Sequence, residues 1–179
     1  RFEPNITLLL NTSCFECRID GPRIAAVRGL QITTQTFHTV EATLFADCSG
    51  DSVLAPLSGA EFREGREARA EFGETIEPEA ADTLRMGSSC LIQARETDRP
   101  QPFTPPAWAY DYPSEADLPS RDHDLHDRRT NFWWIESGGL QDTIGDTEEI
   151  RDELLKIAFG VWDHIKNHGD HGAERWALE

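Results

Sequence analysis

The sequence has 179 residues, of which 38% are hydrophobic and 28% charged, so it can build the core of one good-sized domain or two small ones. No run approaches the roughly 18 consecutive apolar residues of a membrane-spanning helix, which excludes membrane insertion from our expectations. The 33 acidic residues outnumber the 17 basic ones, and the resulting net charge of -16 repels nucleic-acid phosphates and anionic membranes. We therefore expect an acidic protein whose partner is neither nucleic acid nor a membrane.

The first 60 residues have the pattern of β structure. Short runs of apolar and β-branched residues alternate with turn-forming residues, of which Asp20-Gly21-Pro22 is the clearest example. The expected strands cover residues 5–10, 14–19, 23–31, 35–39 and 42–46. Their close spacing predicts a small meander with short connections.

The last of these strands leads into a turn of small and acidic residues. Residues 46–52 read Ala-Asp-Cys-Ser-Gly-Asp-Ser, and apolar residues follow in a helical pattern. Gly50 lets the backbone approach a ligand closely, and a helix start offers free amides. Asp51 or Ser52 is expected to cap this helix, in which Pro56 has a tolerated early position. The pattern alone fits a cofactor turn and an ordinary strand–helix connection equally well.

The middle of the chain combines charged stretches with one long irregular segment. Residues 61–85 are rich in charge, with Arg66 and Arg69 expected in surface ion pairs, and residues 89–94 predict a strand. Pro, Asp, Arg and His dominate residues 98–130, which predicts a long loop. An aromatic strand is expected over residues 131–137.

The strongest helix signal covers residues 147–167. Apolar residues recur there at helical spacing, Asp146 and Glu149 form a capping-box pattern, and Gly169 supplies a stop. This amphipathic helix is expected to cover a sheet that contains the aromatic strand.

Cysteines and histidines raise the question of a metal. Cys14 and Cys17 form a C-x-x-C, but residues three apart on a strand point to opposite faces, which argues against a metal or redox pair. His123 stands among aspartates 122, 124 and 127, while His164, His168 and His171 gather near the helix end. A solvated acidic loop and a helix C-terminus that attracts cations explain these histidines without a metal. We therefore expect no metal site, and the disulfide pairing stays open.

Aromatic residues suggest where a substrate could bind. Trp108, Tyr110 and Trp134 could stack on a sugar, or could simply pack in the core. Alternation along the strand places Trp133 on the opposite face from Trp134, and Glu136 on the Trp134 face. Trp134 and Glu136 are therefore the candidate substrate contacts.

Six blocks of the sequence, taken in order, resemble the FAD-dependent oxidoreductases that have the glutathione-reductase-type flavin fold. The blocks are residues 5–12, 44–55, 58–69, 86–90, 132–139 and 146–167. The resemblance implies a mixed α/β fold: a β-rich partial FAD-binding domain over residues 1–60, then an α+β substrate or cap region over residues 61–179. It also implies flavoprotein chemistry on a small organic or carbohydrate-like substrate.

The resemblance assigns cofactor roles to four residues. Asp51 would lie at the ribityl or pyrophosphate side of FAD, and Gly50 would allow close approach. Ser49 belongs to the same turn, and Cys14 would lie near the adenine through its backbone. No catalytic residue is assigned.

One departure from the family pattern concerns the phosphates. The family carries a G-x-G-x-x-G turn for the pyrophosphate, and the glycines of this chain do not have that spacing. The chain therefore looks like an internal fragment that lacks this segment and a C-terminal one. We expect it to hold about half of a cofactor site, to bind FAD weakly or not at all, to be inactive alone, and to self-associate through uncovered apolar surface. The alternative is a non-catalytic glycan- or protein-binding module that uses the aromatic loop around Trp108.

Overall fold

The computed structural model describes residues 3–118, 123 and 132–179, and for residues 132–134 it describes the backbone alone. The chain divides into two compact units, Arg1–Arg63 and Glu64–Glu179. Each unit contains a small antiparallel sheet, and few helices accompany them. The mixed α/β class predicted from the sequence is thus correct at this level.

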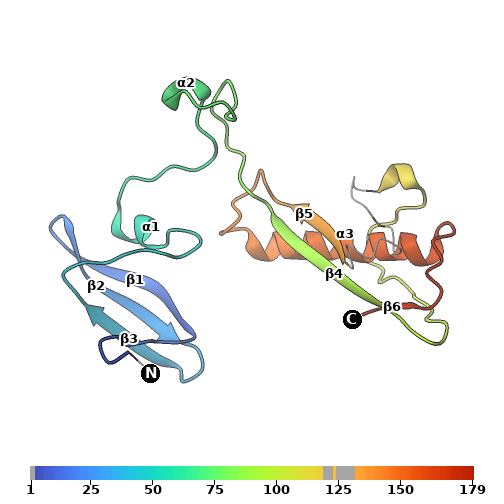
Figure 1. The fold of residues 1–179 in the computed structure, drawn as a ribbon, viewed down its shortest axis with the longest axis horizontal. Helices are drawn as coiled ribbons and strands as arrows, with labels where there is room; N and C mark the ends of the chain where they lie inside the picture. The colour runs from blue at the N-terminus through green and yellow to red at the C-terminus, as the bar shows by residue number, and fades with distance from the viewer. Residues whose placement is uncertain (1–2, 119–122, 124–131) are drawn as a thin grey trace. The chain divides into compact units, whose positions relative to one another are not determined.

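Unit 1 is built on a three-stranded meander. Strands β1 (Thr12–Asp20), β2 (Arg23–Gln31) and β3 (Thr36–Glu41) pair antiparallel in the order β1-β2-β3 (Figure 1). A two-residue turn joins β1 to β2, and Gly21 adopts the left-handed φ of 56° that this turn requires. Three of the five expected strands are therefore confirmed.

The other two expected strands are wrong. Residues 5–10 form no strand, and their alternating side chains Ile6, Leu8 and Leu10 are more than 60% exposed. Residues 42–46 are neither strand nor helix, and Leu44 is 87% exposed. A strand needs a hydrogen-bonded neighbour, and within unit 1 the described ladders join only β1 to β2 and β2 to β3. Apolar patterning alone does not supply such a partner.

A β-bulge in β1 changes which faces its side chains occupy. Cys14 pairs with Gly29 and Cys17 with Val27, while Phe15 has no partner in the register. Because residues 29 and 27 lie on the same face of β2, the extra residue brings Cys14 and Cys17 to one face. The expectation of opposite faces is wrong for this reason, although both cysteines are free thiols.

A short helix packs on β1 on the side of Cys17. Helix α1 (Leu54–Ser58) contacts β1, and the Cys17 Sγ donates to the Leu57 carbonyl oxygen at 3.1 Å. Residues 42–46 form no strand on which this helix could pack, and β1 takes that place. Pro56 lies in the first turn of α1, as predicted.

Unit 1 buries little apolar surface of its own. Ala26 is the one residue of unit 1 among the buried hydrophobic residues of the described chain. Phe15 and Phe37 contact edge to face at 5.9 Å yet stay about half exposed, with the Arg28 guanidinium 4.5 Å above the Phe37 ring. The structure of unit 1 therefore depends more on hydrogen bonds than on the burial of apolar side chains.

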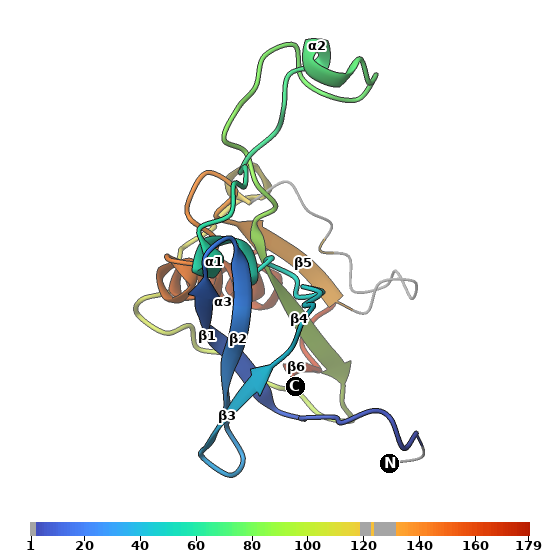
Figure 2. The same cartoon turned by 90° about the vertical axis from the view of Figure 1, so that its left-hand side faces the viewer.

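Unit 2 has a helix-on-sheet core. Strands β5 (Phe132–Ser137), β4 (Ser88–Glu96) and β6 (Trp176–Leu178) pair antiparallel in that order, and α3 (Thr147–Asn167) lies along one face of the sheet (Figure 1, Figure 2). The buried core comprises Ile92, Ala94, Ile135, Ile150, Leu154, Ala158, Val161, Trp162, Ile165 and Ala173. The predicted cover of the aromatic strand by the long helix is confirmed.

The bounds of α3 match the prediction, but its cap does not. Asp146 is the residue before the helix, yet its side chain makes no capping hydrogen bond to α3. Its φ of -97° and ψ of 19° differ from the extended conformation of a capping residue, and its Oδ2 instead accepts from the Asp142 amide at 3.2 Å. The predicted capping box with Glu149 is therefore wrong. Gly169 adopts a φ of 86° just beyond the helix, as expected for a stop.

The described part of the predicted long loop lies against α3. Residues 98–118 contain one short 3-10 helix, η1 (Glu115–Asp117), and no strand; residues 119–122 and 124–131 lie outside the described chain. The Tyr110 amide donates to the Lys156 carbonyl oxygen at 3.2 Å. A Cβ at Gly160 would clash with the Tyr110 carbonyl oxygen, so glycine permits this close approach.

The remaining helix, α2 (Arg69–Phe72), has four residues. None of the described helices has the length and apolarity to cross a bilayer.

Two neighbouring leucines of α3 test this account of the core. Leu154 is 4% exposed and Leu155 is 36% exposed. We predict that Leu154→Ala lowers the free energy of unfolding by about 2–5 kcal/mol, because it leaves a cavity in the core. The matched variant Leu155→Ala should cost less than about 1 kcal/mol. Urea denaturation followed by circular dichroism measures both, and equal losses would contradict the placement of α3.

Candidate cofactor site

The turn that precedes α1 is organised by one carboxylate. Asp47 Oδ1 accepts from the Ser49 amide at 2.9 Å and from Ser49 Oγ at 2.6 Å, and its Oδ2 accepts from the Leu54 amide at 2.7 Å. Ser49 Oγ in turn accepts from the Val53 amide at 3.0 Å. Two side chains thus close residues 47–54, hereafter the cofactor turn, around the first amides of α1.

This arrangement corrects the predicted cap. Asp51 and Ser52 were expected to cap α1, but Asp47 and Ser49 hold the amides at its start. Ser52 adopts a φ of 49°, and its carbonyl oxygen accepts from the Ala55 amide at 2.9 Å. Because these side chains already occupy the helix-start amides, and α1 has five residues, the turn offers no ready binding place for a phosphate.

The Asp47 carboxylate is held in its ionised form. The hydrogen bond from the Ser49 hydroxyl, followed by those from the backbone amides of Leu54 and Ser49, lowers the pKa of Asp47 below its usual range. The turn therefore depends on a charge that persists well below neutral pH.

The tip of the cofactor turn, unlike its base, is open to solvent. Gly50 and Asp51 are exposed, and a Cβ built at Gly50 would meet nothing within 4 Å. Gly50 is not among the residues with positive φ, so its backbone conformation does not demand glycine. Neither strain nor crowding within the described chain explains a glycine at this position, and the space beside it is open.

The four predicted cofactor residues lie on adjoining elements of unit 1. Ser49, Gly50 and Asp51 belong to the cofactor turn, and Cys14 lies half-buried on β1, the strand against which α1 packs. Cys14 Sγ lies 3.9 Å from the Glu16 carbonyl oxygen, which is a weak contact. Sequence reasoning missed Asp47 as the organiser of the turn, although an aspartate two residues before a serine is a known turn signal.

The predicted substrate contacts belong to unit 2. Trp134 pairs with Leu91 through the backbone, and its side chain lies outside the described part of the chain. Glu136 pairs with Ser89 and is exposed. Arg66 forms the expected surface ion pair, with Asp82 as its partner.

The aromatic loop presents a shallow pocket on unit 2. Trp108 is 50% exposed and packs edge to face on Phe159 at 5.1 Å. The Tyr110 hydroxyl donates to Glu153 Oε1 at 2.6 Å, and this bond raises the pKa of Tyr110. A pocket of about 360 Å³ is lined by Trp108, Asp152, Leu155 and Lys156. It combines an aromatic surface with one carboxylate and one ammonium group.

Comparison with known protein families gives one match. The family model described as FAD dependent oxidoreductase covers residues 2–179, which is nearly the whole chain and includes both units. No curated protein and no solved structure matches the chain.

The different positions of Asp47 and Asp51 lead to a prediction about acid stability. Asp47→Asn should destabilise unit 1, because the amide nitrogen that replaces one oxygen cannot accept a hydrogen bond. Since the folded-state pKa of Asp47 is lowered, its stabilising contribution is complete above the unfolded value of about 3.9 and is lost as the pH falls through the folded value. The wild type should therefore lose its advantage over Asp47→Asn below about pH 4.

The matched control is Asp51→Asn at the exposed tip of the same turn. It should leave the stability of unit 1 unchanged from pH 7 to about pH 3, because Asp47 and Ser49, rather than Asp51, hold the first amides of α1. Thermal unfolding at several pH values and NMR titration of both carboxyl groups test this pair. A larger effect of Asp51→Asn than of Asp47→Asn would refute the assignment of the cap.

Proposed function

We propose a role in flavin binding for the cofactor turn of this chain, which belongs to the family of FAD-dependent oxidoreductases. Family membership supports a general oxidoreductase function, in which bound FAD supplies the electron or hydride transfer. The chain's own residues then bind and orient the cofactor. The observation that carries the proposal is the open, exposed Gly50–Asp51 tip on a turn whose Val53 and Leu54 amides are already occupied.

The cofactor turn fits the hydroxyl-bearing part of FAD better than its phosphates. Asp51 is an exposed carboxylate, which accepts hydrogen bonds from hydroxyl groups. The amides of Val53 and Leu54 are occupied by Ser49 and Asp47, so they cannot also hold a phosphate. The net charge of -16 further opposes a diphosphate. We therefore assign Asp51 to the ribityl or ribose hydroxyls.

The other predicted residues have supporting roles in this proposal. Gly50 leaves room for the cofactor to approach the backbone, because even a methyl group in place of its hydrogen would meet no neighbouring atom within 4 Å. Ser49 keeps the tip in place through its bonds to Asp47 and Val53, so it positions the site rather than binding FAD. Cys14 contributes backbone on the adjoining strand, on the adenine side.

For unit 2 we propose the substrate-facing role, with a small organic or carbohydrate-like substrate. The half-exposed Trp108 and the pocket beside it favour a planar or sugar-like ligand, since aromatic rings stack on such surfaces. The same observation favours the second candidate, a non-catalytic module that binds a glycan or a protein.

The sequence that the gene encodes ahead of residue 1 distinguishes the two candidates. A strand followed by G-x-G-x-x-G there supports the flavoprotein, and an unrelated domain supports the binding module.

The first test of the proposal is an FAD titration of residues 1–179. We predict no binding at micromolar FAD by calorimetry and no yellow protein after gel filtration, because the chain has neither the G-x-G-x-x-G spacing nor free amides at α1. Micromolar binding would show that the phosphates are held elsewhere in these residues. Self-association of the chain, measured by light scattering in the same samples, is a further expectation.

The second test places the variant in the full-length gene product. Asp51→Ala should reduce the bound flavin per polypeptide, measured from the flavin absorbance of the purified protein. Asp20→Ala is the matched control, because Asp20 is also an exposed aspartate of unit 1 but lies at the β1–β2 turn. An unchanged flavin content in Asp51→Ala would remove Asp51 from the site.

A further inference from the structure

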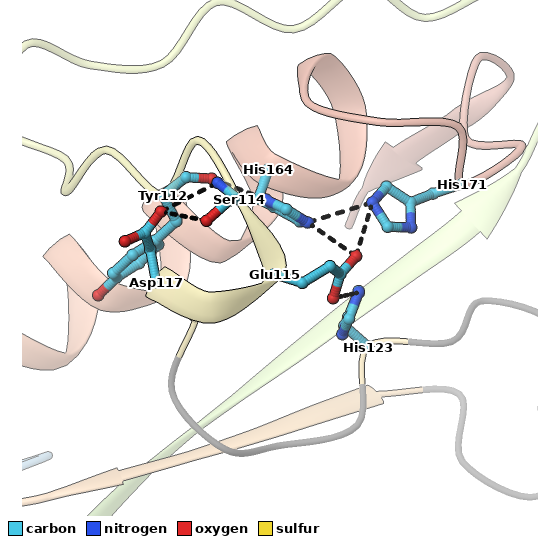
Figure 3. A network of polar contacts seen from close by, with 7 residues as sticks. All are labelled: Tyr112, Ser114, Glu115, Asp117, His123, His164 and His171. Carbon is cyan, nitrogen blue, oxygen red and sulfur yellow. Dashed lines mark hydrogen bonds and ion pairs between the residues drawn. The ribbon is translucent and has the colours of Figure 1, made fainter.

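Four side chains from separate segments of unit 2 converge on one point. Glu115 comes from η1, His123 from the segment that follows, His164 from α3 and His171 from the loop after α3 (Figure 3). One potential ligand atom of each lies within 4.8 Å of those of the others. These four residues, the histidine cluster, play no part in the proposed flavin site.

The protonation pattern of His164 leaves a lone pair directed into the cluster. His164 is 2% exposed, and its Nδ1 lies 2.7 Å from the Tyr112 carbonyl oxygen. A carbonyl oxygen only accepts, so Nδ1 carries a proton, and the neutral form of the ring has its lone pair on Nε2. That Nε2 lies 3.3 Å from Glu115 Oε1, which is also an acceptor. In the neutral form two acceptors face each other at this distance, and a bound cation would bridge them.

The nearest neighbour of that lone pair is a second imidazole nitrogen. His171 Nε2 lies 3.2 Å from His164 Nε2 and 3.7 Å from Glu115 Oε1. The edges of a tetrahedron with metal–ligand bonds of about 2.0–2.1 Å measure about 3.3–3.4 Å. The three measured separations bracket this value, so the three atoms have the spacing of ligands around one ion.

His123 supplies the fourth donor. Its Nε2 lies 3.2 Å from the second oxygen of Glu115, and its ring centroid lies 5.1 Å from that of His171. Three imidazole nitrogens and one carboxylate oxygen form a donor set that suits zinc and its first-row neighbours. We propose that the histidine cluster binds one divalent transition-metal ion, with Zn²⁺ as the probe of choice.

The surrounding structure holds the ligands in place. The close approach at Gly160 brings the Tyr112 carbonyl to His164, which matches the outer-shell hydrogen bond that metal-binding histidines make. Asp117 Oδ2 accepts from the Ser114 amide at 3.1 Å and from its hydroxyl at 2.6 Å, which fixes the start of η1 beside Glu115. Gly169 then lets the chain turn back so that His171 reaches the cluster.

The site is structural rather than catalytic. Four protein ligands fill a tetrahedral zinc ion, whereas a catalytic zinc keeps one position for water or substrate. Glu115 and His123 belong to the long loop, whereas His164 and His171 belong to the end of α3 and the loop after it. The ion would therefore tie the long loop to the helix end. Removal of the ion should loosen residues 98–118 while leaving the core of α3 intact.

A second group of acidic and histidine residues nearby serves as an internal control. Asp111, Asp163 and His168 also lie within ligand distance of one another. This group has one imidazole, and Asp163 Oδ1 already accepts from Asn167 Nδ2 at 2.5 Å. His168 lies one helical turn beyond His164 and stacks on its ring with 6.2 Å between centroids, but it is not one of the four ligands. Its replacement by alanine therefore perturbs the same helix end without removing a ligand atom of the histidine cluster.

The test is a zinc titration of the full 179-residue chain after treatment with a chelator. We expect one Zn²⁺ per chain by calorimetry and elemental analysis, and a rise in the unfolding temperature on binding. His171→Ala and His123→Ala should each weaken zinc binding by at least about 100-fold, since even outer-shell losses cost about 10–100-fold. His168→Ala should bind zinc as the wild type does.

Glu115→Gln keeps the test decisive if a histidine variant fails to fold. The Glu115 side chain is 65% exposed, so glutamine keeps its shape without disturbing the core, and zinc affinity should fall. Circular dichroism of each metal-free variant confirms its fold. The proposal would be overturned if His168→Ala lost zinc binding while His171→Ala kept it. It would also be overturned if the wild type bound zinc no more tightly than Glu115→Gln does.

Discussion

The burial of one face of α3 against β4 and β5 is the interaction on which unit 2 depends. Trp162, Ile150 and Ile165 are at most 1% exposed, and they fix the helix on the sheet. Two other parts of the unit contact that helix: the long loop lies against it at Gly160, and Lys166 Nζ donates to the carbonyl oxygen of Trp176 in β6 at 2.9 Å. His164 of the histidine cluster also belongs to this helix, and residues 115, 123 and 171 meet it there.

Unit 1 is organised on a different principle. It has almost no buried apolar side chain, and its sheet and cofactor turn are held by backbone ladders and by the hydrogen bonds of Asp47. This arrangement suits a surface that receives a cofactor, because the tip at Gly50 and Asp51 is presented without being covered. The match to the FAD-dependent oxidoreductase family covers both units, and the proposed flavin and metal sites belong to different units of the chain.

Strong periodicity made much of the fold predictable. The bounds of α3 follow from the sequence, because its apolar residues recur with a single helical period along the whole helix. Strand β2 was located instead by its apolar run directly after the turn at Gly21 and Pro22. The strand predicted over residues 42–46 does not form, because a strand needs a hydrogen-bonded partner and its own sequence pattern does not specify one. The bulge at Phe15 reversed the predicted faces of Cys14 and Cys17, since one unpaired residue shifts the alternation.

The sites were less predictable than the elements. Asp47 caps an amide seven residues later, beyond the range of local capping patterns, so the nearer Asp51 was expected to do so. His164 and His171 were recognised together, but Glu115 and His123 join them only through the fold.

The central claim is tested most directly by a structure of the FAD-loaded protein. The account predicts an Asp51 carboxylate oxygen about 2.6–3.2 Å from a ribityl or ribose hydroxyl of FAD; FAD phosphates on the amides of Val53 and Leu54, with Asp51 facing water, would contradict it.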